Sequence, residues 1–338
     1  MLPNSRFTDL LADIEPSATT KGHAQSAHFR VRDHLRTHAD FKKRHEGDFL
    51  AGSYSRDTAI RPRKTADGHD RPDVDIIIET SFSTSDTPID VLNELADALR
   101  DAFTVERINK RSVRVLTTNS EIDVVPVIPV GIVYQLPDRD LGGWKLTNPP
   151  GHNAWSTAQN KAFAGRFKPL VKLFKWWRRH NKTGKRPKGF VLEVLVAKHA
   201  PTGELHYGEA FAQMLESIRD AYATNAEYGL KPAIDDPGLP GNDILSKVSI
   251  TDWKAFMARV KSHAATARKA QDTADNEKAT DIWRDIFGER FPKPATASAA
   301  ASGAARSVGG TVTAIAPAAS SFVFPDAPAT PTSPRGFA

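Results

Sequence analysis

The stretch DFLAGSYSRDTAIRPRKTADGHDRPDVDIIIE, residues 48–79, decides the fold. Its first six residues form a short apolar run that ends in Gly52 and Ser53, a pattern typical of a strand that leads into a turn. Gly52 lets the backbone approach a phosphate closely, and Ser53 can offer a hydroxyl and an amide at a helix start. Residues 60–72 hold turn formers and basic groups, and therefore predict a loop before the next strand.

The second half of this stretch carries a pair of carboxylates. Residues 73–79 predict a strand in which Asp73 and Asp75, two residues apart, point to the same face. The three isoleucines that follow indicate a strand buried on both sides. Two neighbouring acids repel each other unless a cation lies between them, and magnesium, which prefers oxygen ligands, resolves that conflict. A third acid, Asp123, lies on a later apolar strand, where a charge is costly unless it is paired or bound to a metal.

Three carboxylates beside a Gly-Ser turn suit two-metal phosphoryl transfer. In that chemistry one metal activates the attacking hydroxyl, and the other binds the triphosphate and stabilises the leaving pyrophosphate. An isolated Asp-x-Asp is most often a surface turn or a helix cap, so the pair alone indicates metal binding and no more. The conjunction of the turn, the pair and the later acid predicts a nucleotidyltransferase core.

The surrounding pattern predicts an α+β fold. Residues 6–46 show apolar positions at helical spacing and indicate two helices broken near Pro16. A helix is expected over 88–103, followed by strands at 112–117 and 121–130. Together with the strands already described, these elements form a small mixed sheet with helices on one side. The chain has no Rossmann or Walker glycine pattern.

The second half of the chain has a helical pattern. A loop rich in proline and glycine is expected at 137–153, and beyond it the apolar spacing predicts a helical lobe over 166–291, after a nucleotidyltransferase core with N-terminal helices over 1–165. Residues 292–338 hold four charged residues among Ala, Ser, Thr, Pro and Gly, and such a segment is expected to be a disordered tail. Within the lobe we expect further helices at 188–199, 207–223, 251–270 and 276–287.

Composition narrows the class of function. The formal net charge of +6 favours an anionic partner such as nucleotide phosphates, nucleic acid or an acidic protein. The absence of cysteine excludes disulfides, thiolate metal sites and a thiol nucleophile. No apolar run is long enough for a signal peptide or a membrane span, so a cytoplasmic location without membrane contact is expected.

At this point the residues resemble a known group of enzymes. The segments GSYSRDTAIRP, DVDIII and EIDVVPVIP look like the core of the DNA polymerase β-like nucleotidyltransferases, and are most similar to the bacterial cGAS/DncV-like enzymes, or CD-NTases of the SMODS type. The segment FKPLVKLFKWWRR resembles their long spine-side helix, and the resemblance extends over residues 6–292. It implies a two-lobed enzyme that joins nucleoside triphosphates into a cyclic di- or trinucleotide with release of pyrophosphate. It also implies a place in CBASS anti-phage defence, where the product switches on a downstream effector.

The resemblance assigns roles to individual positions. Asp73 and Asp75 would bind two magnesium ions, for which manganese is a possible substitute, and Asp123 would complete the site at the metal that activates the acceptor hydroxyl. Gly52 and Ser53 would hold the triphosphate of the donor nucleotide, ATP or GTP being expected.

Two further positions match the family pattern less closely. Lys175 matches a helix lysine that contacts the donor phosphates, although the same residue would also suit a solvated helix face. Where animal relatives have Ser-Tyr, this chain has Gly189 and Phe190. Phe190 could stack on a base, or could be an ordinary core aromatic, and the serine hydroxyl contact is lost.

Basic residues and the C-terminus leave other partners open. Arg61, Arg63 and Lys64 form a basic loop, and a second run of Lys and Arg spans 175–188 with two interleaved tryptophans. Either could bind nucleic acid, although solvated loop charges and core tryptophans explain both features. The resemblance further implies that a ubiquitin-transfer-like enzyme could join the terminal Ala338 to a target, while a passive tail explains the same sequence.

Two other functions fit the carboxylate pattern. A template-independent RNA nucleotidyltransferase of the tailing or CCA-adding type uses the same core but makes no small cyclic product. A non-catalytic nucleotide or RNA sensor would have no need for three clustered acids. The leading hypothesis is therefore a cyclic oligonucleotide synthase.

Overall fold

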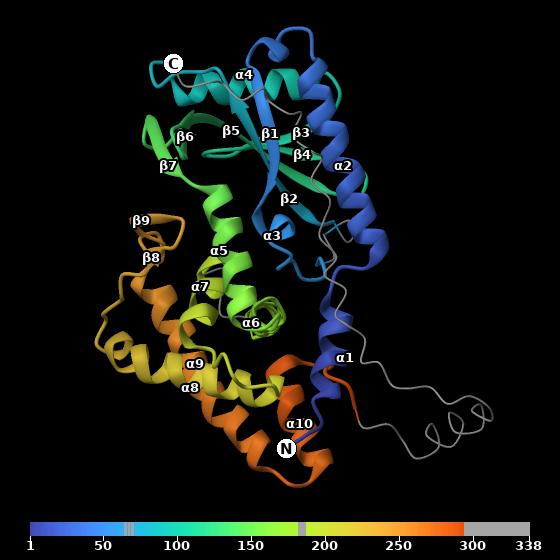
Figure 1. Ribbon diagram of the computed structural model, residues 1–338, viewed down its shortest axis with the longest axis vertical. Coiled ribbons are helices and arrows are strands. Elements are labelled where there is room, and N and C mark those ends of the chain that lie inside the picture. Colours follow the sequence, from blue (N-terminus) through green and yellow to red (C-terminus); the bar gives the residue numbers. More distant parts are fainter. Residues whose placement is uncertain (64–65, 67, 69–70, 182–186, 294–338) are drawn as a thin grey trace, which may run out of the picture.

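The computed structural model describes residues 1–63, 66, 68, 71–181 and 187–293. The predicted disordered tail, apart from its first two residues, lies outside the described residues, as do Lys64 and the terminal Ala338. A mixed sheet with two helices forms one lobe, and a bundle of helices forms the other (Figure 1).

In the described part of the chain, seven strands form the main sheet, with the order β1-β2-β5-β4-β3 and with β6 pairing with both β5 and β7. Strand β2 is parallel to β5, and the other neighbours are antiparallel. The strands are β1 (His45–Ala51), β2 (Asp73–Thr80), β3 (Thr104–Ile108), β4 (Val113–Leu116), β5 (Glu121–Val130), β6 (Val133–Asp138) and β7 (Gly143–Thr147).

Two helices cover one face of this sheet. Helices α2 (Ala18–Thr37) and α4 (Pro88–Arg100) share a buried core with Val74, Ile76 and Ile78 of β2. The intervening Ile77 is also buried, but it packs on the opposite face, so the strand is covered on both sides as the sequence predicts. Because side chains alternate along a strand, Asp73 and Asp75 share the face of Ile77 and point away from α2 and α4.

The helical lobe has its own core, in which Trp253 and Trp283 are fully buried. A short hairpin of β8 (Asp235–Asp236) and β9 (Leu239–Asp243) lies at its edge (Figure 1). The other elements of this lobe are α1 (Ser5–Ile14), α5 (Pro149–Ala162), α6 (Phe167–His180), α7 (Gly189–His199), α8 (Tyr207–Glu227), α9 (Ile250–Asp272) and α10 (Asn276–Phe287), while the 3-10 turn Phe41–Lys43 and the short helix α3 (Gly52–Ser55) belong to the sheet lobe.

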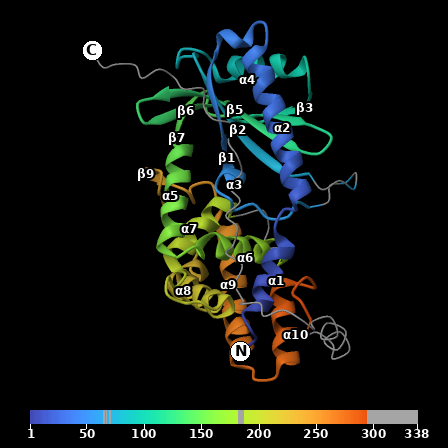
Figure 2. The ribbon, with the colours of Figure 1, turned by 45° about the vertical axis from the view of Figure 1, so that its right-hand side comes forward.

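Helix α1 lies with the second lobe, although the sequence assigns it to the first. Its buried Phe7, Leu10 and Ile14 belong to the core of the helical lobe, and α1 extends below α2 toward α10 (Figure 2). The break near Pro16 is where the chain passes from one lobe to the other. The amphipathic pattern of α1 shows that the helix buries one face, but it does not show which core receives that face.

The predicted loop at 137–153 is wrong in most of its length. Gly142, with φ +61°, lies in the turn between β6 and β7, and Pro149 and Pro150 begin a helix. Pro149 stands in the first turn of α5, and the side chain of Asn148 accepts a hydrogen bond from the Gly151 amide as the N-cap. The same residue types that indicate a loop are therefore used here as a hairpin turn and a helix start.

A membrane-spanning helix, which would have to be both long and strongly apolar, is not found in the part of the chain that the structure describes.

Candidate active site

The predicted carboxylates come from two adjacent parallel strands. In the pairing of β2 with β5, Asp75 is directly opposite Asp123, and Asp73 is opposite Glu121. Along β5, Asp123 points to the same face as Val125 and Val127, because alternate residues of a strand share a face. Those two valines pack on the face away from α2 and α4. The strand register therefore brings all three predicted residues to one edge of one face.

The Gly-Ser turn touches this edge. Gly52 follows β1 with φ +70°, a backbone conformation that side chains rarely adopt. A Cβ atom at this position would lie 1.8 Å from Oδ2 of Asp75, so the turn and the carboxylate can approach this closely only with glycine. Ser53 lies in the four-residue helix α3, and its carbonyl accepts a hydrogen bond of 2.9 Å from the Thr58 amide. The phosphate contact of Ser53 stays a prediction.

The carboxylates destabilise one another as anions. Burial, with the nearby charges of Asp73 and Asp123, raises the pKa of Asp75 to about 7. A cation placed among these oxygens would reverse this unfavourable interaction. Carboxylate oxygens are also the ligands that magnesium prefers, so the residues fit a magnesium site.

Arg114 is hydrogen-bonded to two of these acids and to the neighbouring Glu121. Its Nη1 lies 2.7 Å from Oε2 of Glu121, its Nη2 lies 3.0 Å from Oδ1 of Asp73, and its Nε and Nη2 both donate to Asp123. In the described part of the chain, no three His, Asp or Glu side chains converge as metal ligands. At this edge, the carboxylate of Asp123 accepts hydrogen bonds from Arg114 on β4.

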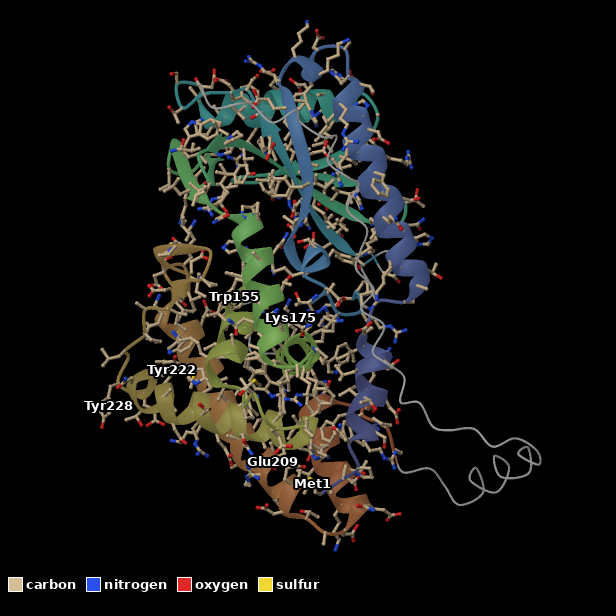
Figure 3. All side chains as sticks on the ribbon, viewed as in Figure 1. Met1, Trp155, Lys175, Glu209, Tyr222 and Tyr228 are labelled. Atoms are coloured by element: carbon tan, nitrogen blue, oxygen red, sulfur yellow. The ribbon has the colours of Figure 1, made fainter. Side chains whose placement is uncertain are left out.

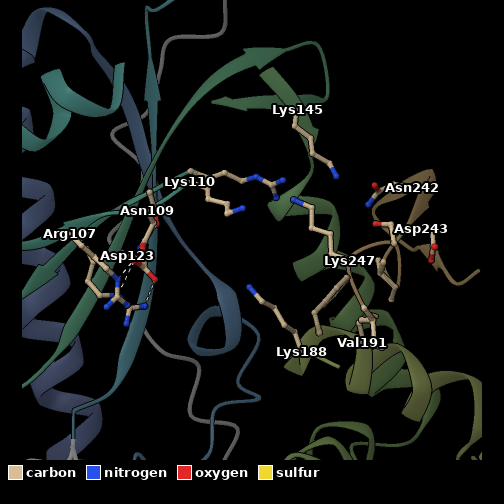
Figure 4. Close-up of a pocket in the computed structure, with 17 residues that line it drawn as sticks. Arg107, Asn109, Lys110, Asp123, Lys145, Lys188, Val191, Asn242, Asp243 and Lys247 are labelled. Atoms are coloured by element: carbon tan, nitrogen blue, oxygen red, sulfur yellow. Dashed lines mark hydrogen bonds and ion pairs between the residues drawn. The ribbon is translucent and has the colours of Figure 1, made fainter. Parts of the chain in front are cut away.

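A cavity of about 640 Å³ opens beside Asp123 (Figure 4). Its size is within the range of small-molecule sites. The β3–β4 hairpin, β7, the start of α7 and the chain after β9 form its walls. Its basic lining residues, which suit a polyphosphate, are Arg107, Lys110, Arg111, Arg114, Lys145, Lys188 and Lys247.

The structure does not place Lys175 in this cavity. Its ammonium donates to the Thr58 carbonyl at 3.0 Å, to the Thr58 hydroxyl at 2.9 Å and to Oε1 of Glu193 at 2.8 Å. These bonds use all three donors of a lysine, so no donor is left for the predicted phosphate contact. Figure 3 shows Lys175 between the two lobes, where its side chain is only 7% exposed.

Glu193 is the centre of this buried cluster. Arg56 binds its carboxylate through two hydrogen bonds of 2.9 and 3.1 Å, and the Thr58 hydroxyl donates a third. Burial would raise the pKa of Glu193, but Lys175 and Arg56 outweigh it and hold the pKa at about 2. The cluster joins the segment after the Gly-Ser turn to α6 and α7, and thereby links the lobes.

Phe190 lies at the wall of the cavity, and its stacking on a base stays a prediction. It lines the cavity, and it also packs against His152 at a ring distance of 4.6 Å and beneath the guanidinium of Arg56 at 5.1 Å. Lys188, two residues before Phe190, also lines the cavity, and its side chain points into the open space (Figure 4). In the sequence, Lys175 and Lys188 belong to one basic run. The structure distinguishes them by where their side chains lie, Lys175 in the buried cluster and Lys188 at the cavity.

Comparisons with known proteins agree with this geometry. Residues 1–160 match the family model described as Second Messenger Oligonucleotide or Dinucleotide Synthetase domain. A "Cyclic AMP-AMP-AMP synthase" of Acinetobacter is 44% identical, over 100% of this chain and 98% of its own. A "Cyclic AMP-AMP-GMP synthase" of Enterobacter hormaechei is 24% identical, over 86% of this chain and 92% of its own.

Solved structures share the fold. The CdnC protein of E. coli MS115-1 with ATP superposes with a TM-score of 0.68 at 18% identity, covering 86% of this chain and 99% of its own. The CD-NTase CdnG of Bradyrhizobium diazoefficiens in complex with GTP superposes with a TM-score of 0.70 at 16% identity. The match covers 85% of this chain and 95% of the CdnG chain. The predicted α+β two-lobed fold is therefore confirmed.

The relative at 44% identity spans the helical lobe as well as the carboxylate edge, and the predicted resemblance is confirmed by it. Nucleotidyltransferases of this kind are typically metal-dependent. The chain belongs to the second messenger oligonucleotide or dinucleotide synthetases, the CD-NTase nucleotidyltransferases that make cyclic oligonucleotides.

Proposed function

We propose that this enzyme joins three molecules of ATP into cyclic AMP-AMP-AMP. The observation that carries the proposal is the juxtaposition of Asp75 and Asp123 on paired strands with a cavity lined by basic side chains. The name of the Acinetobacter relative supports the choice of three adenylates. The ATP and GTP named in the solved relatives support a nucleoside triphosphate as the substrate class.

In each round of the proposed reaction, a ribose hydroxyl of one nucleotide attacks the α-phosphorus of the next. The new O–P bond forms as the bond from the α-phosphorus to the bridging oxygen breaks, and pyrophosphate leaves with that electron pair. The hydroxyl proton is released to solvent. Two such rounds give an open trimer, and a third, within that trimer, closes the ring.

The protein groups divide this work between them. Asp73, Asp75 and Asp123 would hold two magnesium ions, or manganese, which lower the pKa of the hydroxyl and neutralise charge on the leaving pyrophosphate when bound. The basic side chains of the cavity neutralise the triphosphates, and Phe190 supplies an aromatic face for a base.

Lys188 replaces Lys175 as the proposed lysine for the triphosphate. Its side chain points into the open cavity (Figure 4). Burial raises the pKa of Asp73, and the positive charge of Lys188 works against that rise. Lys188→Ala is expected to raise the KM for ATP by roughly 10- to 100-fold, since a hydrogen bond to a charged group contributes about 1.5–3 kcal/mol. The measurement is initial rate against ATP concentration.

Lys198→Ala, on an exposed position of the same helix, is the matched control for Lys188 and should leave KM unchanged. Equal KM values for the two variants would contradict the role of Lys188.

Gly52→Ala tests the contact between the turn and the carboxylate. We expect product formation to fall roughly a hundredfold, because the new Cβ must displace Oδ2 of Asp75, and a displacement of about 1 Å can cost that much. Gly142→Ala is the control, because Gly142 has the same left-handed backbone with open space around it. Both variants carry similar backbone strain, so a similar loss of activity in the two would show that strain, and not the collision, is the cause.

The product itself tests the proposed function. The protein is incubated with ATP, GTP, CTP and UTP in the presence of magnesium, and the phosphatase-resistant products are identified by mass spectrometry. We expect a cyclic trimer of AMP. A product that contains another base, or elongation of added RNA with no small product, would overturn the proposal.

The biological setting is proposed on the same basis. We propose that the product activates a downstream effector in anti-phage defence. The solved CdnC:HORMA-deltaN complex of E. coli MS115-1, in which a relative is bound to a second protein, supports this setting. Attachment of Ala338 by a ubiquitin-transfer-like enzyme stays a prediction, because the tail lies outside the described residues.

A further inference from the structure

One wall of the cavity carries an amide that the phosphoryl-transfer steps do not use. Asn242 lies on β9 and lines the cavity with Phe190, across from Asp123 (Figure 4). Its Nδ2 donates one hydrogen bond of 3.1 Å to Oδ2 of Asp236. An asparagine amide has two N–H donors and one carbonyl acceptor. Within the described residues, the second donor and the acceptor have no side-chain or backbone partner, and both are available to a ligand.

Asp236 sets the orientation of that amide. Its side chain is buried, and its Oδ1 accepts hydrogen bonds from Nε2 of His152 at 2.7 Å and from the Gly238 amide at 2.9 Å. A Cβ on Gly238 would lie 2.5 Å from Cδ2 of His152, so glycine permits this close packing of the hairpin on α5. Because an ionised carboxylate only accepts hydrogen bonds, it must face the NH2 group of Asn242 rather than its oxygen.

The same residues connect the amide to the aromatic face. His152, which bonds to Asp236, packs on Phe190 at a ring distance of 4.6 Å. Phe190 and Asn242 are therefore held relative to each other by His152 and Asp236. A base that stacks on Phe190 would present its edge to an amide whose donor and acceptor positions are already set.

That arrangement distinguishes adenine from guanine. The Watson–Crick edge of adenine offers a donor, N6–H, beside an acceptor, N1, whereas guanine offers the acceptor O6 beside the donor N1–H. A freely flipping amide could pair with either base, but an amide of fixed orientation fits one order. We propose, on the basis of the proposed function, that Asn242 reads the adenine of ATP and that Asp236 is the positioning residue that excludes guanine.

Another amide in the cavity lacks this freedom. Nδ2 of Asn109 donates to Ser112 and Asp123, both at 3.1 Å, and its Oδ1 accepts from Arg107 at 3.0 Å. Its donors and its oxygen are thus already engaged on the carboxylate side of the cavity. Asn242 is therefore the better candidate for pairing with a base edge.

The test measures kcat/KM for ATP and for GTP separately, by release of pyrophosphate, in the full chain. Asn242→Ala is expected to lower the value for ATP by roughly 10- to 100-fold, the discrimination that a bidentate amide–base pair supplies, and to leave the value for GTP unchanged. Asp236→Asn is expected to keep most of the kcat/KM for ATP and to raise the kcat/KM for GTP. An amide at position 236 can donate as well as accept a hydrogen bond, so the Asn242 amide can then flip. Asn225→Ala, exposed on α8, is the control.

The ATP-to-GTP ratio separates base reading from a structural role. If Asn242→Ala and Asp236→Asn lose both activities in parallel, so that the ratio stays at the wild-type value, the inference is overturned. Asn242→Ser, which keeps a small polar side chain on the hairpin, repeats the test should the alanine variant not fold. If the wild-type protein makes no ring that contains AMP, the proposed function is refuted. If the wild-type protein makes a ring of AMP but the variants keep the wild-type ATP-to-GTP ratio of kcat/KM, only the role of Asn242 is refuted.

Discussion

Asp75→Asn is expected to lower the rate of cyclic product formation by at least about a thousandfold, since metal-assisted charge stabilisation contributes several kcal/mol and each 1.36 kcal/mol is a factor of ten. Asparagine keeps the size of the side chain beside Gly52 but loses the charge that would hold the metal. The mutation also removes one of three mutually repelling carboxylates, so the folded protein should not lose stability. The measurement is the rate with saturating ATP and magnesium, together with the melting temperature.

Asp9→Asn is the matched control, because Asp9 is exposed on α1 in the other lobe. It should retain wild-type activity. If Asp75→Asn folds normally and keeps more than a tenth of the wild-type rate, the carboxylate edge is not the catalytic site.

Glu193→Ala is expected to produce the largest loss of stability. It leaves the buried ammonium of Lys175 and the guanidinium of Arg56 without their shared carboxylate. Removing one partner of a buried ion pair costs about 3–5 kcal/mol, which corresponds to a drop in melting temperature of roughly 5–15 °C for a chain of this size. Thermal unfolding followed by circular dichroism measures it.

Two comparisons make the Glu193 result specific. Glu227→Ala removes an exposed partner of Lys261, and it should change the melting temperature little, because surface ion pairs contribute at most about 1 kcal/mol. Adding Lys175→Met to Glu193→Ala should recover part of the loss, since a buried charge is then removed. A melting temperature of Glu193→Ala within one degree of the wild type would contradict the claim that the buried cluster stabilises the folded protein.

The individual residues of the carboxylate edge could be predicted from the sequence because the signal for each of them is local. Alternation along a strand places Asp73 and Asp75 on one face, and the apolar context of Asp123 predicts a second strand with a charge. The left-handed turn at Gly52 is likewise a property of that glycine and its neighbours. None of these features depends on knowing which distant segment packs nearby.

The rest of the site depends on pairings between distant segments. Arg114 meets Asp123 because β4 and β5 pair in that register, which alternation alone does not specify. Lys175 and Lys188 belong to one basic run, yet Lys175 lies in a buried cluster and Lys188 lines the cavity. Asn242 reaches the cavity from a hairpin more than a hundred residues beyond Asp123. Such contacts are set by tertiary packing, and the sequence carries no local signal for them.

Pyrophosphate stoichiometry tests the central claim most directly. The enzyme is given ATP and magnesium, pyrophosphate and consumed ATP are counted, and the product labelled at the α-phosphorus is treated with phosphatase. Ring closure predicts one pyrophosphate for every ATP consumed and a label that phosphatase does not release. An open trimer would give two pyrophosphates for every three ATP and would lose its terminal phosphates to phosphatase, and that result would contradict the assignment of this carboxylate edge to cyclic oligonucleotide synthesis.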